Sequence, residues 1–366
     1  MKSKIIQLSI LTASLSVAFL SCKREMKVNQ ADKLPKQDVF ASDYNEIVNN
    51  KITQNVLQKA TVDNDMAALG RLLFYDSRLS LTGTISCASC HKQEIGFADN
   101  VAFSVGFTGK QTGMNALAIS NLNSDNVLFW RNRANTLEKL SLMPVANHIE
   151  MGFLSLDEVV KNINRIPFYQ ETFNKVFQSE ANQNNISKAM GQFLRSMQSA
   201  NSKYDQGFAT TTTANFSNFS DMENYGKQLF FTTYNCASCH GVPSKIQSGW
   251  SEIMSNIGLD PEGKGSGDSM GGFKVPSLRN IALTAPYMHD GRFNSLSEVI
   301  DHYSAGIQMN QSLSWQLRET DPNSGQSRPK KFNIPDTDKT ALIAFLRTLT
   351  DNSYLHDKRF SNPFVQ

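Results

Sequence analysis

The chain has 366 residues and a formal net charge of +3 at pH 7, with 40% hydrophobic and 19% charged residues. This composition is that of an ordinary globular protein with enough residues for two domains. The small net charge excludes the strongly basic surface typical of nucleic-acid binding, and only the N-terminal apolar stretch is of interest as a membrane segment.

Residues 1–21 predict a lipoprotein signal peptide. A lysine-bearing start is followed by an apolar run that ends at Leu20, and the small residue Ser21 precedes Cys22. We expect cleavage before Cys22 and lipidation of that cysteine, so the mature chain would be an exported, periplasm-side lipoprotein anchored to the membrane by lipid alone. An ordinary signal peptide with an incidental cysteine is the alternative. The polar segment 22–40 is predicted to be a tether.

Helical patterns dominate the rest of the chain, and segment 41–208 is predicted to be the first of two domains. Met66–Phe74 predicts a short helix, Ser155 and Glu158 have capping-box spacing, and apolar residues follow an i, i+3, i+4, i+7 pattern over 186–197. Runs that alternate with a period of two are scarce. We therefore expect an all-α (mainly α) fold.

A Thr-, Asn- and Ser-rich segment at 209–220 is predicted to be a linker, with a second domain at 221–350 and a C-terminal tail at 351–366. Met222–Phe231 predicts a helix that shares the pattern G-[RK]-x-L-F with Met66–Phe74. This internal repeat indicates two related units. A second capping box begins at Ser295 with Glu298, and an apolar pattern over Asp338–Leu349 predicts the helix that covers the core of the second unit.

Each unit contains the pentapeptide C-A-S-C-H, at Cys87–His91 and Cys236–His240. The C-x-x-C-H pattern is typical of c-type haem attachment, in which Cys87, Cys90, Cys236 and Cys239 would bond the vinyl groups of two haems. The histidine that follows each pair, His91 or His240, would then reach the iron as the proximal ligand. We therefore expect two covalently bound haem c groups, one in each cytochrome c-like domain.

Two other interpretations of these motifs are a redox-active C-x-x-C pair and half of a zinc site. Neither explains why a histidine directly follows the second cysteine in both copies. The four motif cysteines and Cys22 are all the cysteines in the chain. With these assignments none is left for a disulfide bond.

From Ala67 to Asp351 the chain resembles the bacterial dihaem cytochrome c peroxidase family, which includes the MauG-type enzymes that oxidise protein tryptophans. The resemblance is carried by motifs in a fixed order: L-G-R-x-L-F, F-W, E-M-G, V-P-S-L-R-N and T-A-P-Y-M-H-D-G. It implies that the first haem reacts with peroxide and that the second transfers electrons.

The resemblance assigns roles to two residues between the haem motifs. Glu150 of the E-M-G motif matches the distal glutamate, which would take a proton from one peroxide oxygen and deliver it to the other. Trp130 matches the tryptophan that relays electrons between the haems. From the residues alone, the more frequent role of a residue such as Glu150 is that of a surface or capping glutamate, and that of Trp130 is a core residue.

Many relatives carry a distal histidine that blocks the first iron until the second haem is reduced. The matching segment here, 106–110, has no histidine, so we expect a first haem that is open to peroxide without reductive activation. His148 is expected to lie on the pocket wall or the surface, and assistance to Glu150 or ligation of the iron is its alternative role. Methionines that could still cap this iron, although core packing is their more frequent role, are Met114, Met143 and Met151.

The sixth ligand of the second haem is expected to be Tyr303, which stands where the peroxidases have methionine and the MauG-type enzymes have tyrosine. A phenolate ligand stabilises oxidised iron, whereas a thioether raises the reduction potential. Met288 and Met309 are the fallback ligands, and Tyr303 could instead be a packing residue.

The resemblance also implies a calcium ion between the domains, with possible ligands Asn115, Thr284 and Pro286.

The predicted function is a cytochrome-c peroxidase that reduces hydrogen peroxide to water with electrons from a small donor cytochrome or cupredoxin. The family is commonly dimeric, so a homodimer is possible. A MauG-like oxidase of a protein or small aromatic substrate is the alternative enzyme, favoured by Tyr303. A dihaem electron-transfer cytochrome is the non-enzymatic alternative. That class needs strong ligands on both faces of both irons, and the histidines beyond the two proximal ones are only His148, His289, His302 and His356.

Overall fold

The computed structural model describes residues 34–35, 39–46, 61–125, 127–208, 215–241, 254–261 and 271–364. They belong to one compact unit, Lys33–Gln366. The predicted signal peptide, Cys22, most of the tether and the first half of the 209–220 linker lie outside the described residues. Among the described helices, none combines the length and the apolarity that crossing a bilayer requires.

The first hydrophobic core is built around the crossing of α3 (Asn64–Tyr75) and α8 (Gln183–Ser196). Helix α3 starts where the Asp63 carboxylate accepts a hydrogen bond from the Met66 N–H at 2.9 Å. The two helices approach so closely at Gly70 that a β-carbon there would collide with the carbonyl of Ala189. Gly70 therefore fixes the geometry of the crossing.

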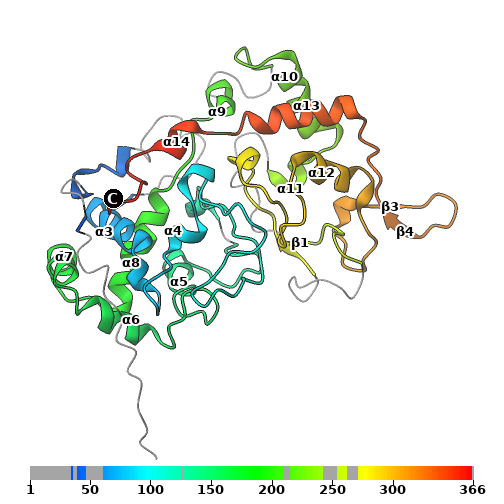
Figure 1. Cartoon of the computed structure of the whole chain (residues 1–366). Helices are drawn as coiled ribbons and strands as arrows, with labels where there is room; N and C mark the ends of the chain where they lie inside the picture. The colour runs from blue at the N-terminus through cyan, green and yellow to red at the C-terminus, as the bar shows by residue number, and fades with distance from the viewer. Residues whose placement is uncertain are drawn as a thin grey trace, which may run out of the picture. The chain divides into compact units, whose positions relative to one another are not determined.

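The second core repeats this arrangement with α10 (Asp221–Gln228) and α13 (Asp336–Arg347), which lie side by side in Figure 1. A β-carbon at Gly226 would collide with the carbonyl of Ala341. Helix α10 continues into a π-helical turn, Leu229–Thr233, in which Phe230 packs on Phe345 with ring centroids 5.2 Å apart. Each of the two glycines of the G-[RK]-x-L-F repeat thus allows two helices to cross at close distance. The predicted repeat of cytochrome c-like units is confirmed.

Further helices complete each half of the molecule. On the first core these are α5 (Leu137–Leu142), α6 (Leu156–Ile163) and α7 (Pro167–Phe177), and on the second α9 (Lys203–Phe208) and α12 (Leu296–Asp301). The haem motifs form the one-turn helices α4 (Cys87–Cys90) and α11 (Ala237–His240). The mainly helical prediction is confirmed.

Short elements fill the loops. The 3-10 helices are Val39–Ala41, Ser77–Leu79, Gln93–Ile95, Leu122–Ser124, Ile281–Leu283 and Trp315–Leu317, and His302–Gly306 is a second π-helical turn. Two antiparallel ribbons pair β1 (Met254–Ser255) with β2 (Phe273–Lys274), and β3 (Arg318–Thr320) with β4 (Ser327–Pro329). Of the two predicted capping boxes, the one at Ser295 forms both of its bonds, and Ser155 caps α6 by accepting from the Glu158 N–H at 3.4 Å.

The C-terminal segment returns to the first core. After α13 the chain forms α14 (Asn352–His356), and Tyr354, Phe360 and Phe364 are buried in the first hydrophobic core. At the start of this return Asp351 is buried and accepts hydrogen bonds from the Ser199 hydroxyl at 3.2 Å and the Asn201 N–H at 2.9 Å. The tail is therefore part of the folded structure.

Candidate functional site

The first motif presents both cysteines on one side of a single helical turn. Helix α4 holds Cys87 and Cys90 at i and i+3, which places their side chains on the same face. The next residue, His91, has its ring atom Nδ1 2.9 Å from the carbonyl oxygen of Phe97. Because a carbonyl only accepts, Nδ1 carries the proton and Nε2 keeps its lone pair, as a metal-binding imidazole requires.

The second motif uses the same arrangement. Cys236 is the N-cap residue of α11, Cys239 lies within this helix, and Nδ1 of His240 lies 3.3 Å from the carbonyl oxygen of Pro276. Burial lowers the pKa of His240 to about 4 and also lowers the pKa of His91. Both imidazoles are therefore neutral at physiological pH, the form that binds a metal.

The environment of the cysteines argues against a redox dithiol. Burial raises the pKa of Cys87 and of Cys236 to about 12. Thiol–disulfide chemistry requires a thiolate, which a low pKa provides. Among the residues that the structure describes, no three or more Cys, His, Asp or Glu side chains form a cluster arranged for a metal ion.

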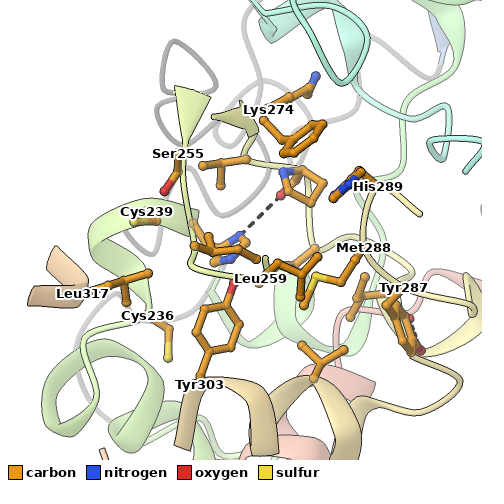
Figure 2. Close-up of a pocket in the computed structure, with 18 of the residues that line it drawn as sticks. Cys236, Cys239, Ser255, Leu259, Lys274, Tyr287, Met288, His289, Tyr303 and Leu317 are labelled. Carbon is orange, nitrogen blue, oxygen red and sulfur yellow. Dashed lines mark hydrogen bonds between the residues drawn. The ribbon is translucent and has the colours of Figure 1, made fainter. Parts of the chain in front are cut away.

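A cavity of about 370 Å³ lies above the second motif. Cys236, Cys239 and His240 line it together with apolar side chains such as Leu259 and Leu317, as Figure 2 shows in part. Two thiols, one imidazole with a free Nε2 and apolar walls are the set that a covalently attached haem requires. The residues present therefore fit a c-type haem.

Two candidate sixth ligands reach this cavity. Figure 2 shows Tyr303 projecting into it from the π-helical turn His302–Gly306, and Met288 directing its sulfur into it. Burial raises the pKa of Tyr303, and the neighbouring motif thiols raise it further. The third candidate, Met309, is 40% exposed and does not line the cavity.

Glu150 lies in a loop that positions its carboxylate on the side of the first motif. The side-chain amide of Asn147 donates to Glu150 Oε1 at 3.1 Å, and the Asn147 carbonyl oxygen Oδ1 accepts from the Glu150 N–H at 3.2 Å. Burial raises the pKa of Glu150, and the Arg133 guanidinium opposes this rise. Burial is the main cause that raises the pKa values of Cys87 and Cys90, and the negative charge of Glu150 adds to it, which indicates that the carboxylate lies on the side of the first motif.

The segment that matches the blocking loop of relatives lies directly beside Glu150. It is the tip of a hairpin closed by the Val105–Gln111 bridge, and the Phe107 N–H donates to the Glu150 carbonyl oxygen at 3.0 Å. The Phe107 ring occupies the space where a β-carbon on Gly152 would lie. This loop thus places an aromatic ring, which has no ligating atom, next to the Glu150 loop.

The histidine and the methionines that were considered as ligands of the first haem differ in their exposure to solvent. His148 is exposed, although it is only two residues from the half-buried Glu150. Met151 is buried in the first core, and Met143 packs against that core. Met114 is half-buried.

Trp130 lies on the seam between the two halves. Its indole Nε1 donates to the carbonyl oxygen of Asn115 at 2.8 Å, and its ring lines the cavity of the second motif. The backbone of β2 holds the loop that carries Trp130, because the Lys274 N–H donates to the Trp130 carbonyl oxygen at 2.8 Å. The Lys274 ammonium also forms a buried ion pair with Asp125. Trp130 is therefore fixed by contacts from both halves of the chain.

All three predicted calcium ligands are among the residues that line the same cavity. Asn115 donates from Nδ2 to the carbonyl of Val101 at 3.1 Å, and the Thr284 hydroxyl lies 3.4 Å from the Ile281 carbonyl. Pro286 follows a cis peptide bond. None of the three residues is a carboxylate, and a calcium site here stays a prediction.

Four residues of the site were not predicted from the sequence. Phe107 contacts the Glu150 loop, and Arg133 opposes the rise that burial causes in the Glu150 pKa. Phe273 stacks on His289 with ring centroids 3.7 Å apart, and Trp130 meets both rings edge to face. No spacing pattern indicates these contacts. The T-A-P-Y-M-H-D-G motif was the available signal for His289.

Comparison with known proteins agrees with this geometry. The family model for di-haem cytochrome c peroxidase matches residues 64–213, and the model for cytochrome c matches residues 224–350. The chain is 32% identical to cytochrome c551 peroxidase of Nitrosomonas europaea, over 80% of this chain and 83% of that protein. It is 31% identical to the methylamine utilization protein MauG of Methylorubrum extorquens, over 78% of each chain.

Among solved structures, the crystal structure of a MauG-like protein associated with microbial copper homeostasis superposes with a TM-score of 0.71. It is 33% identical to this chain, and the match covers 83% of this chain and 95% of that one. The similarity thus extends over both haem motifs and the loops between them.

Proposed function

The chain belongs to the di-haem cytochrome c peroxidase family, a family of haem-dependent oxidoreductases, and we propose that it reduces hydrogen peroxide to water with electrons from a small redox protein. The observation that carries this proposal is the placement of Glu150. Glu150 is half-buried, its carboxylate accepts a hydrogen bond from the side-chain amide of Asn147, and its pKa is raised. A carboxyl with a raised pKa holds a proton more readily than an ordinary glutamate, which suits a group that takes up a proton and releases it again.

Residues of the chain transfer the protons and leave the first haem site accessible to peroxide. Glu150 takes a proton from one peroxide oxygen and returns it to the other, so that the leaving oxygen departs as water. Asn147 holds the carboxylate, and Phe107 places an aromatic ring beside it without a ligating atom. A haem held by Cys87, Cys90 and His91 would supply the redox-active iron for this reaction. Complete reduction of one peroxide consumes two electrons and two protons.

The second motif is proposed as the electron-transfer site. Cys236, Cys239 and His240 would hold a haem in the 370 Å³ cavity, and Trp130 lies on its wall. The contacts of Trp130 with Asn115 and β2 support a role as the relay between the two sites. The donor is proposed to be a small cytochrome or cupredoxin.

A MauG-like oxidase is the second candidate, and the position of Tyr303 favours it. The phenol projects into the second cavity, where an oxygen ligand would stabilise oxidised iron. The oxidising equivalents from peroxide would then oxidise a protein or small aromatic substrate instead of a donor protein. Substrate oxidation in the absence of any donor separates this candidate from the peroxidase.

Several finer assignments stay proposals. They are lipidation of Cys22 with anchoring on the periplasmic side, calcium binding by Asn115, Thr284 and Pro286, and homodimer formation. Each is open to a direct measurement: mass spectrometry of the mature N-terminus, calcium titration of the holo-protein, and sedimentation.

The test of the proposed function is peroxide consumption by the holo-protein with the small diffusible donor tetramethyl-p-phenylenediamine. We expect oxidation of two donor molecules for each peroxide consumed. A holo-protein that carries both haems and leaves peroxide unchanged would overturn the proposal.

A further inference from the structure

Trp315 is the feature of the second half that the proposed function does not use. Its side chain is 79% exposed, although tryptophan is among the side chains with most to gain from burial. It also lines the cavity above the second haem motif. One side chain therefore connects the interior of that cavity with the protein surface.

The loop that carries Trp315 is held firmly in place. Leu313 and Leu317 on either side are buried, and the Ser314 N–H donates to the Asn256 carbonyl oxygen at 2.9 Å. After Trp315 in the chain, the Leu317 carbonyl oxygen accepts a hydrogen bond from the Lys330 N–H at 2.8 Å. Leu317 faces the same cavity in Figure 2. Because its neighbours are anchored, Trp315 is held outward by the fold.

The surroundings of Trp315 are positively charged. Segment 315–332 has four basic and two acidic side chains, a net charge of +2. Both acids, Glu319 and Asp321, pair with Arg328 at 2.8 and 2.6 Å. Within the described residues, the ion pairs include no carboxylate partner for Lys330 or Lys331, and Lys330 also lines the cavity. The rim of the cavity beside Trp315 is therefore cationic.

We propose that Trp315 and the cationic segment 315–332 form the docking and electron-entry site for an acidic one-electron donor protein. This inference rests on the proposed function, because it names the partner of the second cavity. Tryptophan is enriched among the few residues that dominate binding energy at interfaces. Opposite charges speed the encounter of the two proteins.

The electron count is simple. In each encounter the donor's metal centre loses one electron, the electron crosses the Trp315 indole into the cavity, and the indole is left unchanged. Two encounters supply the two electrons that one peroxide needs. No proton moves in this step, because the indole keeps its N–H.

The test uses reduced plastocyanin as an acidic probe and a basic mitochondrial-type cytochrome c as its counterpart. Binding of oxidised holo-protein to plastocyanin is followed by NMR shift perturbation. Electron delivery is followed by stopped-flow absorption, because colourless reduced plastocyanin turns blue when it loses its electron. We expect Trp315→Ala to weaken binding by about 30-fold, the effect of losing an interface tryptophan. Trp315→Phe should bind more tightly than Trp315→Ala, because it keeps an aromatic ring. Lys331→Glu should weaken binding and reduce its salt dependence.

The matched control is Leu154→Ala, since Leu154 is also exposed, at 87%, and does not line the cavity. It should leave both readouts unchanged. Equal binding and equal electron delivery in Trp315→Ala and wild type would overturn the inference, and so would tighter binding of the basic cytochrome. Peroxide turnover with tetramethyl-p-phenylenediamine tests the proposed function separately, because that donor needs no docking site.

Discussion

Asn147 holds Glu150 from two directions: its amide nitrogen donates to the Glu150 carboxylate at 3.1 Å, and its carbonyl oxygen accepts from the Glu150 backbone N–H at 3.2 Å. A single short loop thereby orients the carboxyl of the half-buried Glu150. Since proton transfer requires correct geometry as well as a suitable pKa, this pair is the basis of the mechanism proposed for peroxide reduction.

Glu150→Gln should lower peroxide turnover by about 100- to 10,000-fold, the range that general acid–base groups contribute. Glutamine keeps the shape and loses the exchangeable proton. The measurement is peroxide consumption with haem content determined in parallel, and both haems should stay attached. Glu171→Gln, on an exposed position of α7, is the matched control. Undiminished turnover in Glu150→Gln would remove Glu150 as the acid–base group.

The pH profile should reveal the raised pKa of Glu150. Only the ionised carboxylate accepts a proton from peroxide, so the rate should fall on acidification, with a midpoint above that of an ordinary glutamate. Arg133→Gln removes the cation that opposes this rise, so the midpoint should move to higher pH. Arg131→Gln, two residues away, is the control. A midpoint that Arg133→Gln leaves in place or lowers would show that the two side chains do not interact.

Tyr303→Phe and Met288→Leu distinguish the two side chains that reach the second cavity. Removing the true ligand should change the absorption and magnetic resonance spectrum of one haem, while the other substitution leaves it unaltered. If neither variant changes the spectrum, both side chains are packing residues. Met309→Leu, at an exposed position away from the cavity, serves as the control.

Gly70→Ala and Gly226→Ala should each destabilise one of the two helix crossings. A methyl group at either position would collide with a carbonyl on the facing helix, and overpacking of this kind costs about 1–3 kcal/mol. Denaturant unfolding of the holo-protein measures the loss. Gly113→Ala provides the comparison, since a β-carbon there meets no other atom within 4 Å. Equal stability of all three variants would contradict the proposed role of the glycines.

The local features of this fold could be predicted from the sequence. The two C-x-x-C-H motifs, the repeat containing Gly70 and Gly226, and the helix Asp336–Arg347 each depend on residues close together in the chain. Their spacing is therefore visible in the sequence itself.

The remaining features depend on contacts between distant segments, which no local pattern encodes. Phe107 meets Gly152 across two loops, and Phe360 returns from the C-terminus to the first core. Arg133 influences Glu150 only because the chain folds back between them. The exposure of Trp315 likewise follows from the anchoring of its neighbours and not from its own type.

The central claim is that the first site is open to peroxide without prior reduction. The most direct measurement is the electron paramagnetic resonance spectrum of the oxidised holo-protein before and after one equivalent of hydrogen peroxide. We predict a high-spin signal from one haem that disappears on addition of peroxide. Two low-spin signals that peroxide does not change would contradict the claim, because both irons would then carry strong ligands on both faces.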